Sequence, residues 1–147
     1  MADQKPQTFQ NHVRIVPLFH QFALPVLLLN LIWTIYHMVK AGISFETVDG
    51  ILLALALMVI ALYGRVFALT VQDRVIRLEM RLRLTELLPP NLRPRIPEFT
   101  VPQLVSLRFA SDAELPALAR KALDEKLSDR KTIKQLVKDW QGDYLRA

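Results

Sequence analysis

The amino-acid sequence predicts an all-α membrane protein. Its expected fold is a transmembrane hairpin of two helices, with the second helix extended into the cytoplasm and followed by a small C-terminal helical domain. Two long apolar runs lie in the first half of the chain, and no segment shows the alternation typical of a β-strand. Hydrophobic residues make up 52% of the 147 residues, more than a soluble domain of this length needs for its core. Part of the apolar surface is therefore expected to face lipid.

The first predicted span covers residues 22–39. It reads FALPVLLLNLIWTIYHMV, eighteen residues without a formal charge. A helix of this length just crosses a hydrocarbon core of about 30 Å. A signal peptide has a shorter apolar region followed by a small-residue cleavage site, which this stretch lacks. The amide of Asn30 lies in the middle of the span and is expected to hydrogen-bond to the second span, with contact to a pigment, quinone or ion as the alternative.

The second predicted span covers residues 50–71 and completes a membrane segment of residues 22–71. Its one charged residue is Arg65, whose long side chain can carry the guanidinium group to the lipid headgroups. Neither Gly nor Pro occurs between Arg65 and Pro89, so the helix is predicted to continue until Pro89 ends it. We expect residues 72–90 to form a helical stalk.

Positive charge is concentrated at the two ends of the chain. Of the 19 Lys and Arg residues, 16 lie from Arg65 onward and two precede the first span, whereas residues 40–49 between the spans hold one. Lys and Arg tend to stay on the cytoplasmic side of a membrane. We therefore expect residues 1–21 and both termini to lie in the cytoplasm, with a short outer loop between the spans. The net charge of +5 is then explained without nucleic acid.

Residues 91–147 are predicted to form a cytoplasmic domain of short helices after a proline-rich linker. Two pairs of residues, Thr100 with Gln103 and Ser111 with Glu114, have the spacing of a capping box and predict two helix starts.

A last helix is predicted to begin at Ser128, as its N-cap, and to end at Gly142. Within it, Ile133, Val137 and Trp140 recur at helical spacing and are expected to be buried.

Four stretches resemble a known family: NHVRIVPLFHQFALPVLLLN, VQDRVIRLEMRLRL, QLVSLRFASDAELPALARKAL and TIKQLVKDWQGDY. The family consists of small bacterial membrane proteins and is defined only as a domain of unknown function. The resemblance covers most of the chain. It implies a two-span bacterial inner-membrane protein and no particular chemistry.

The predicted stalk carries apolar residues on two opposite sides when its residues are placed at about 100° intervals. The Val71 stripe consists of Val71, Val75, Leu78 and Leu82. The Ile76 stripe consists of Leu69, Ile76, Met80, Leu84 and Leu87. One flank between the stripes is basic and holds Arg74, Arg77 and Arg81, and the other is mainly acidic and holds Gln72, Glu79, Arg83 and Glu86.

Two stripes on one helix indicate contacts with two layers, because an amphipathic helix that faces one core needs one stripe. We expect one stripe to pack on the C-terminal helices and the other to bind another polypeptide, either a copy of this chain or a different membrane subunit. Large flexible side chains suit an adaptable contact, so the Ile76 stripe with the three arginines beside it is expected to be the partner face. The alternative is that the C-terminal helices cover both stripes.

No catalytic residue, cofactor or metal site is expected. The sequence has no Cys and none of the motifs GxSxG, HExxH or a P-loop. The three histidines, His12, His20 and His37, are expected to be polar residues at the membrane interface. Lys131, Lys134 and Lys138 are expected to line a solvated helix face. The alternative is that these lysines, with Arg130, contact anionic lipid or RNA. Aromatic residues do not interleave with these lysines, so no nucleic-acid partner is expected.

These observations predict a non-enzymatic structural or accessory subunit of an inner-membrane assembly. It would be inserted in the lipid bilayer by the hairpin and would bind protein through the stalk and the C-terminal helices. The alternative is a solitary membrane-surface adaptor, whose basic cytoplasmic domain contacts anionic lipid or a soluble partner.

Overall fold

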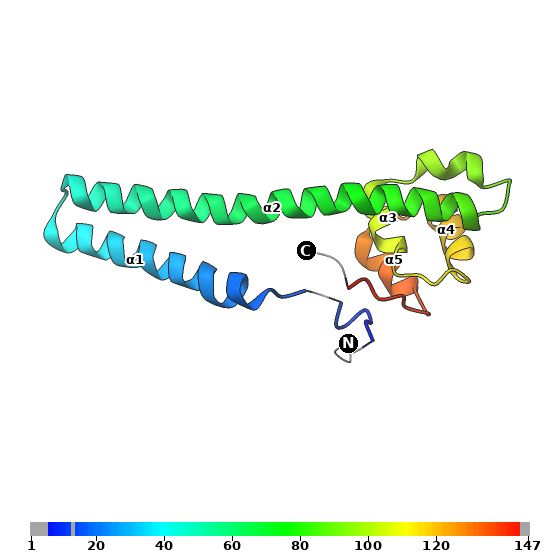
Figure 1. The fold of residues 1–147 in the computed structure, drawn as a ribbon, viewed down its shortest axis with the longest axis horizontal. Coiled ribbons are helices and arrows are strands. Elements are labelled where there is room, and N and C mark those ends of the chain that lie inside the picture. Colours follow the sequence, from blue (N-terminus) through cyan, green and yellow to red (C-terminus); the bar gives the residue numbers. More distant parts are fainter. Residues whose placement is uncertain (1–5, 13, 145–147) are drawn as a thin grey trace. The chain divides into compact units, whose positions relative to one another are not determined.

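The computed structural model describes residues 6–12 and 14–144, and the all-α prediction is confirmed for them (Figure 1). The first five residues of the expected N-terminal segment lie outside the described residues. The elements are a π-helix η1 (Leu18–Ala23), α1 (Leu24–Ala41), α2 (Phe45–Leu87), a 3-10 helix η2 (Arg93–Glu98), α3 (Val101–Leu107), α4 (Leu115–Asp124) and α5 (Arg130–Leu136). They belong to two compact units, one of Arg14–Leu69 and one of Thr70–Ala147 with Met1–Val13.

The unit Arg14–Leu69 contains the first predicted span and residues 50–69 of the second. Two helices, Leu18–Ala41 and Phe45–Leu87, are long and apolar enough to cross a membrane, judged by length and composition. In the most apolar 18-residue stretch of each helix, 0% of the residues are buried in Leu18–Ala41 and 6% in Phe45–Leu87. These apolar side chains therefore do not form the core of this unit.

Helix α1 ends at Ala41 and is followed by Gly42, whose φ of 93° lies in the left-handed region that favours glycine. The N–H of Gly42 donates a hydrogen bond to the carbonyl of Met38 at 3.0 Å and closes the last turn. Helix α2 then starts almost at once, because the Ser44 N–H donates to Thr47 Oγ1 at 2.9 Å and the Thr47 N–H donates to Ser44 Oγ at 3.2 Å.

The predicted end of the long helix is confirmed, since α2 stops at Leu87, just before Pro89. A proline cannot supply the N–H that another helical turn needs. The start lies at Phe45, within the segment that was expected to form the outer loop, so the connection between α1 and α2 is only residues 42–44. Residues 93–98 of the expected linker form η2.

One of the two predicted capping boxes is confirmed. The Gln103 N–H donates to Thr100 Oγ1 at 3.4 Å and the Thr100 N–H donates to Gln103 Oε1 at 2.8 Å at the start of α3. The prediction for α4 is wrong, because no side chain caps that helix. The Glu114 carboxylate instead accepts hydrogen bonds from the N–H groups of Lys138 at 2.9 Å and Asp139 at 3.0 Å. A tertiary contact has replaced the local one.

The last helix differs from its prediction at both ends. Its N-cap is Asp129, not Ser128, and the Asp129 carboxylate accepts from the Thr132 N–H at 2.7 Å. The helix ends at Leu136, well before Gly142, because the chain then pairs with the segment after α3. Ala110 and Trp140 form an isolated antiparallel bridge, in which the Gln141 N–H donates to the Phe109 carbonyl at 2.7 Å. Ile133 and Val137 are buried as expected, and Trp140 is half-buried against the core.

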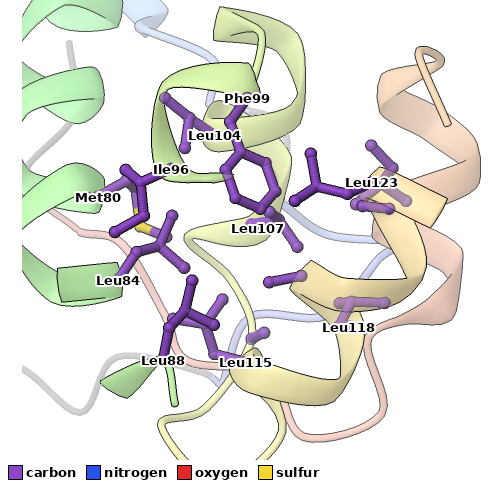
Figure 2. Close-up of a cluster of buried hydrophobic side chains, with 14 of the residues drawn as sticks. Met80, Leu84, Leu88, Ile96, Phe99, Leu104, Leu107, Leu115, Leu118 and Leu123 are labelled. Atoms are coloured by element: carbon purple, nitrogen blue, oxygen red, sulfur yellow. The ribbon is translucent and has the colours of Figure 1, made fainter. Parts of the chain in front are cut away.

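The core of the unit that begins at Thr70 forms between the last turns of α2 and the short helices. Figure 2 shows Met80 and Leu84 of α2 pointing toward Ile96, Leu107 and Leu115 from three later elements. Fully burying one such side chain contributes about 1.5 to 3 kcal/mol. Residues of the predicted stalk therefore supply one wall of this core.

The N-terminal segment belongs to the same unit and contacts the end of the chain. Gln7 Nε2 donates to the Asp143 carbonyl at 3.1 Å, and the Asp143 N–H donates to Gln7 Oε1 at 3.1 Å. The His12 ring lies 5.9 Å from that of Phe109 and 5.7 Å from that of Trp140, measured between centroids. His12 is thus part of an aromatic cluster in this unit.

Candidate protein-binding surface on helix α2

The two apolar stripes of α2 have opposite environments. The exposed fractions are 5% for Ile76, 3% for Met80 and 0% for Leu84, and Leu87 is half-buried against the same core. The Val71 stripe is exposed along its whole length: Val71 by 59%, Val75 by 49%, Leu78 by 63% and Leu82 by 60%. The Ile76 stripe, which was expected to be the partner face, is therefore largely buried in the chain's own core, and that prediction is wrong.

The short C-terminal helices pack on one side of α2 only. They contribute leucines and alanines that cover this face, and the side chains of Ile76, Met80 and Leu84 pack against them. Leu69 lies in the other unit and is 37% exposed, so it does not extend this buried face.

The basic flank next to the Val71 stripe is mostly exposed. Arg74 and Arg77 are exposed and Arg81 is half-buried, and together with Leu78 they line a shallow hollow. Among the residues that the structure describes, none of these three guanidinium groups forms an ion pair. Arg81 Nε is buried without a hydrogen-bond partner in this part of the chain.

The opposite flank of the Val71 stripe carries Glu79 and Glu86, which are both exposed. Neither carboxylate takes part in an ion pair within the described ranges 6–12 and 14–144. The exposed apolar stripe is therefore bordered by arginines on one side and glutamates on the other.

Arg83 is a structural residue whose role the sequence did not reveal. Its Nη2 donates to the Ala110 carbonyl at 2.6 Å and to Gln141 Oε1 at 2.8 Å, and it lies 2.7 Å from Asp112 Oδ1. The side chain is 19% exposed and joins α2 to the segment that pairs with Gln141. Its partners are 27 to 58 positions away in the sequence, so local spacing carries no signal for them.

The row of basic residues on the last helix is only partly solvated. Lys134 Nζ lies 5.3 Å from the centroid of the Phe109 ring and 3.1 Å from His12 Nε2. Arg130 Nη2 forms an ion pair with Asp73 Oδ2 of α2 at 3.2 Å. Lys134 and Arg130 therefore contact other residues of the same unit, so the prediction of a solvated face is wrong for Lys134.

In the unit Arg14–Leu69, Asn30 is exposed on α1. Its side-chain amide forms no hydrogen bond to α2 in the part of the chain that the structure describes, so the expected link to the second span is absent there. It lines a shallow hollow with apolar and aromatic residues of the same helix: Val26, Leu29, Ile32, Trp33 and Tyr36. Arg65 is half-buried within its unit.

The described residues contain no cluster of three or more His, Asp or Glu side chains that could hold a metal ion. Hydrogen bonds from the backbone and side chain of Thr132 lower the pKa of Asp129, and hydrogen bonds to Asp124 and Glu98 raise the pKa of Arg95. An open hollow beside α4 is lined by Glu114 and Lys121 among others, but the Glu114 carboxylate already accepts hydrogen bonds from the backbone.

The fold and this surface define an all-helical protein with two helices long and apolar enough to cross a membrane, and with one charged-and-apolar helix face left exposed. The chain belongs to a family of unknown function, DUF6526, whose profile matches residues 1–147. Comparisons with curated proteins and with solved structures give no match.

Proposed function

We propose that this protein is a non-enzymatic structural or accessory subunit of a protein assembly in a bacterial inner membrane. Its two apolar helices form a transmembrane hairpin with both termini in the cytoplasm, and its cytoplasmic unit binds protein. The observation that carries the proposal is the Val71 stripe, which the chain's own core leaves uncovered while it buries the opposite face of the same helix.

Membrane insertion is supported by the exposure of the two helices. Large apolar side chains such as Leu29, Ile32 and Trp33 on α1, and Leu53 and Ile60 on α2, are more than half exposed. Apolar surface left in water costs about 25 cal/mol per Å². A bilayer removes this cost without requiring a partner on every side of each helix.

The hairpin and its orientation are supported by contacts at both ends. A Cβ atom at Gly50 would lie 3.5 Å from Thr34 Cγ2, so α1 and α2 approach closely near their connection. The hydrogen bonds between Gln7 and Asp143 favour an arrangement with both ends of the chain on one side of the membrane. Such an arrangement requires an even number of crossings, as a hairpin provides. The excess of Lys and Arg outside the spans favours the cytoplasmic side.

The surface itself favours a protein partner over a lipid surface. Its central residues are aliphatic, and charges of both signs border them, whereas a surface for anionic lipid needs an excess of free cations. Lys134 and Arg130, which the adaptor alternative requires, are engaged within the unit. A solitary adaptor is therefore the weaker proposal.

Gentle detergent extraction from the native membrane, followed by mass measurement of the intact particle, tests the proposal. We expect a particle heavier than one chain of 16.9 kDa with its bound lipid and detergent. The variant Val75→Glu/Leu78→Lys should stay folded and membrane-inserted but lose that assembly, because it places charges on an apolar contact. As a matched control, Ile76→Lys/Met80→Glu should destabilise the subunit itself. A wild-type particle with the mass of a single chain would refute the proposal.

A further inference from the structure

The Val71 stripe has the spacing of a coiled-coil seam. Its residues follow one another at intervals of four, three and four positions, which places Val71 and Leu78 at d and Val75 and Leu82 at a of a heptad repeat. All four are exposed, and they lie on α2 within the unit that starts at Thr70. The face is therefore free to receive a second helix.

The charges beside the seam identify the second helix. In this register Arg74 and Arg81 occupy g positions, and Glu79 and Glu86 occupy e positions. In a parallel pair of helices, a g residue lies opposite the e residue of the following heptad on the other helix. Two copies of this chain would therefore place Arg74 opposite Glu79 and Arg81 opposite Glu86, on both sides of the seam.

An antiparallel pair of the same helices would bring g residues together and e residues together. Arginines would then face arginines and glutamates would face glutamates, which is unfavourable. None of the four residues has an ion pair within the described part of its own chain, so their charges are available to a partner. The pattern is self-complementary in the parallel orientation alone.

We propose that the Val71 stripe is the seam of a parallel two-stranded coiled coil between two copies of this chain. The two central positions, Val75 at a and Leu78 at d, have the combination that favours two strands, whereas Val71 at d and Leu82 at a have the reverse. The proposal rests on the proposed function, because insertion in one membrane gives both copies the same orientation. A seam this short is weak between free helices, but confinement to a bilayer raises the effective concentration of each copy around the other.

Single cysteines test the geometry cleanly, because the natural chain has none. In a parallel dimer, equal positions of the seam face each other. Val71→Cys and Leu78→Cys should therefore form disulfide-linked dimers in native membranes under mild oxidation. Arg77→Cys, which lies on the same helix away from the seam, should remain a monomer on the same gel. Equal crosslinking of all three variants, or none at the two seam positions, would overturn the proposal.

Charge exchange tests the identity of the partner with Leu78→Cys as reporter. Arg74→Glu/Arg81→Glu makes both flanks acidic, and Glu79→Arg/Glu86→Arg makes both flanks basic, so each variant alone should lose the crosslinked dimer. Coexpression of the two variants should restore it as a mixed dimer. This recovery would show that loss in the single variants came from repulsion and not from misfolding. No recovery would overturn the pairing.

The particle mass and the crosslinks together separate this inference from the proposed function. A native particle heavier than one chain, without crosslinks between copies, would refute the homodimer. The proposed function would stand, with the Val71 stripe in contact with a different polypeptide. A native particle of single-chain mass would refute both.

Discussion

Leu84→Ala and Leu82→Ala make the same chemical change on opposite faces of one helix, so their comparison isolates burial. Leu84 is 0% exposed and packs with residues from later elements, whereas Leu82 is 60% exposed. Truncating a buried leucine costs about 2 to 5 kcal/mol, depending on how far the surroundings can collapse. Leu84 lies among side chains held by several short helices, so we expect about 3 kcal/mol or more. Leu82→Ala should change the stability of the isolated subunit by less than about 0.5 kcal/mol.

The assay is thermal unfolding of the purified full chain in detergent. The chain has two Trp residues. In a Trp33→Phe background the fluorescence of Trp140 therefore reports on the unit that contains the core. The protein is diluted until the melting temperature no longer depends on concentration, so that any dimer does not contribute. A loss of about 3 kcal/mol should lower the melting temperature of a unit of this size by roughly 12 °C or more. A larger effect of Leu82→Ala than of Leu84→Ala would refute the assignment of the buried face.

Three further predictions follow from particular contacts. Arg83→Met should destabilise the same unit by about 1.5 to 3 kcal/mol, because the buried Ala110 carbonyl loses a charged donor and the exposed Asp112 carboxylate loses its ion pair. Arg77→Met on the exposed surface should be nearly neutral in the same melting assay. The lowered pKa of Asp129 contributes stability that is present above its unfolded pKa and is lost as the pH falls through the folded pKa. Asp129→Ala should therefore weaken the pH dependence of the melting temperature in the acid range. A variant whose melting temperature falls with acid as steeply as that of the natural protein would contradict this prediction. A reporter enzyme fused after Ala147 should be active in the cytoplasm and one inserted at Ser44 should be active outside; activity of the C-terminal fusion outside would contradict the proposed orientation.

Local chemistry made several features predictable from the sequence. The presence of two long apolar helices follows from runs of mostly uncharged residues, and the end of α2 follows from Pro89, because each depends on neighbours in the chain. The capping box of Thr100 and Gln103 is correct for the same reason, since its two residues are three positions apart. Helical spacing alone is also enough to locate both stripes of α2.

Competition between distant groups made other features unpredictable. Glu114 has the right spacing for a cap, yet it binds the backbone at Lys138 and Asp139, 24 and 25 positions away. The last helix stops at Leu136 because the following residues gain hydrogen bonds to the segment around Ala110, which no local pattern indicates. In each case a long-range partner displaced the local one.

The sequence by itself determined that α2 has two apolar faces separated by charges, because that property depends only on the angle between successive residues of a helix. It did not determine which face is buried, since both stripes are aliphatic and of similar length. That choice was made by the tertiary structure, in which the chain returns after Pro89 and packs apolar side chains from η2, α3 and α4 against Ile76, Met80 and Leu84. The physical reason is that the C-terminal helices cover one side of α2 only, and the side that they leave exposed is the surface available to a partner.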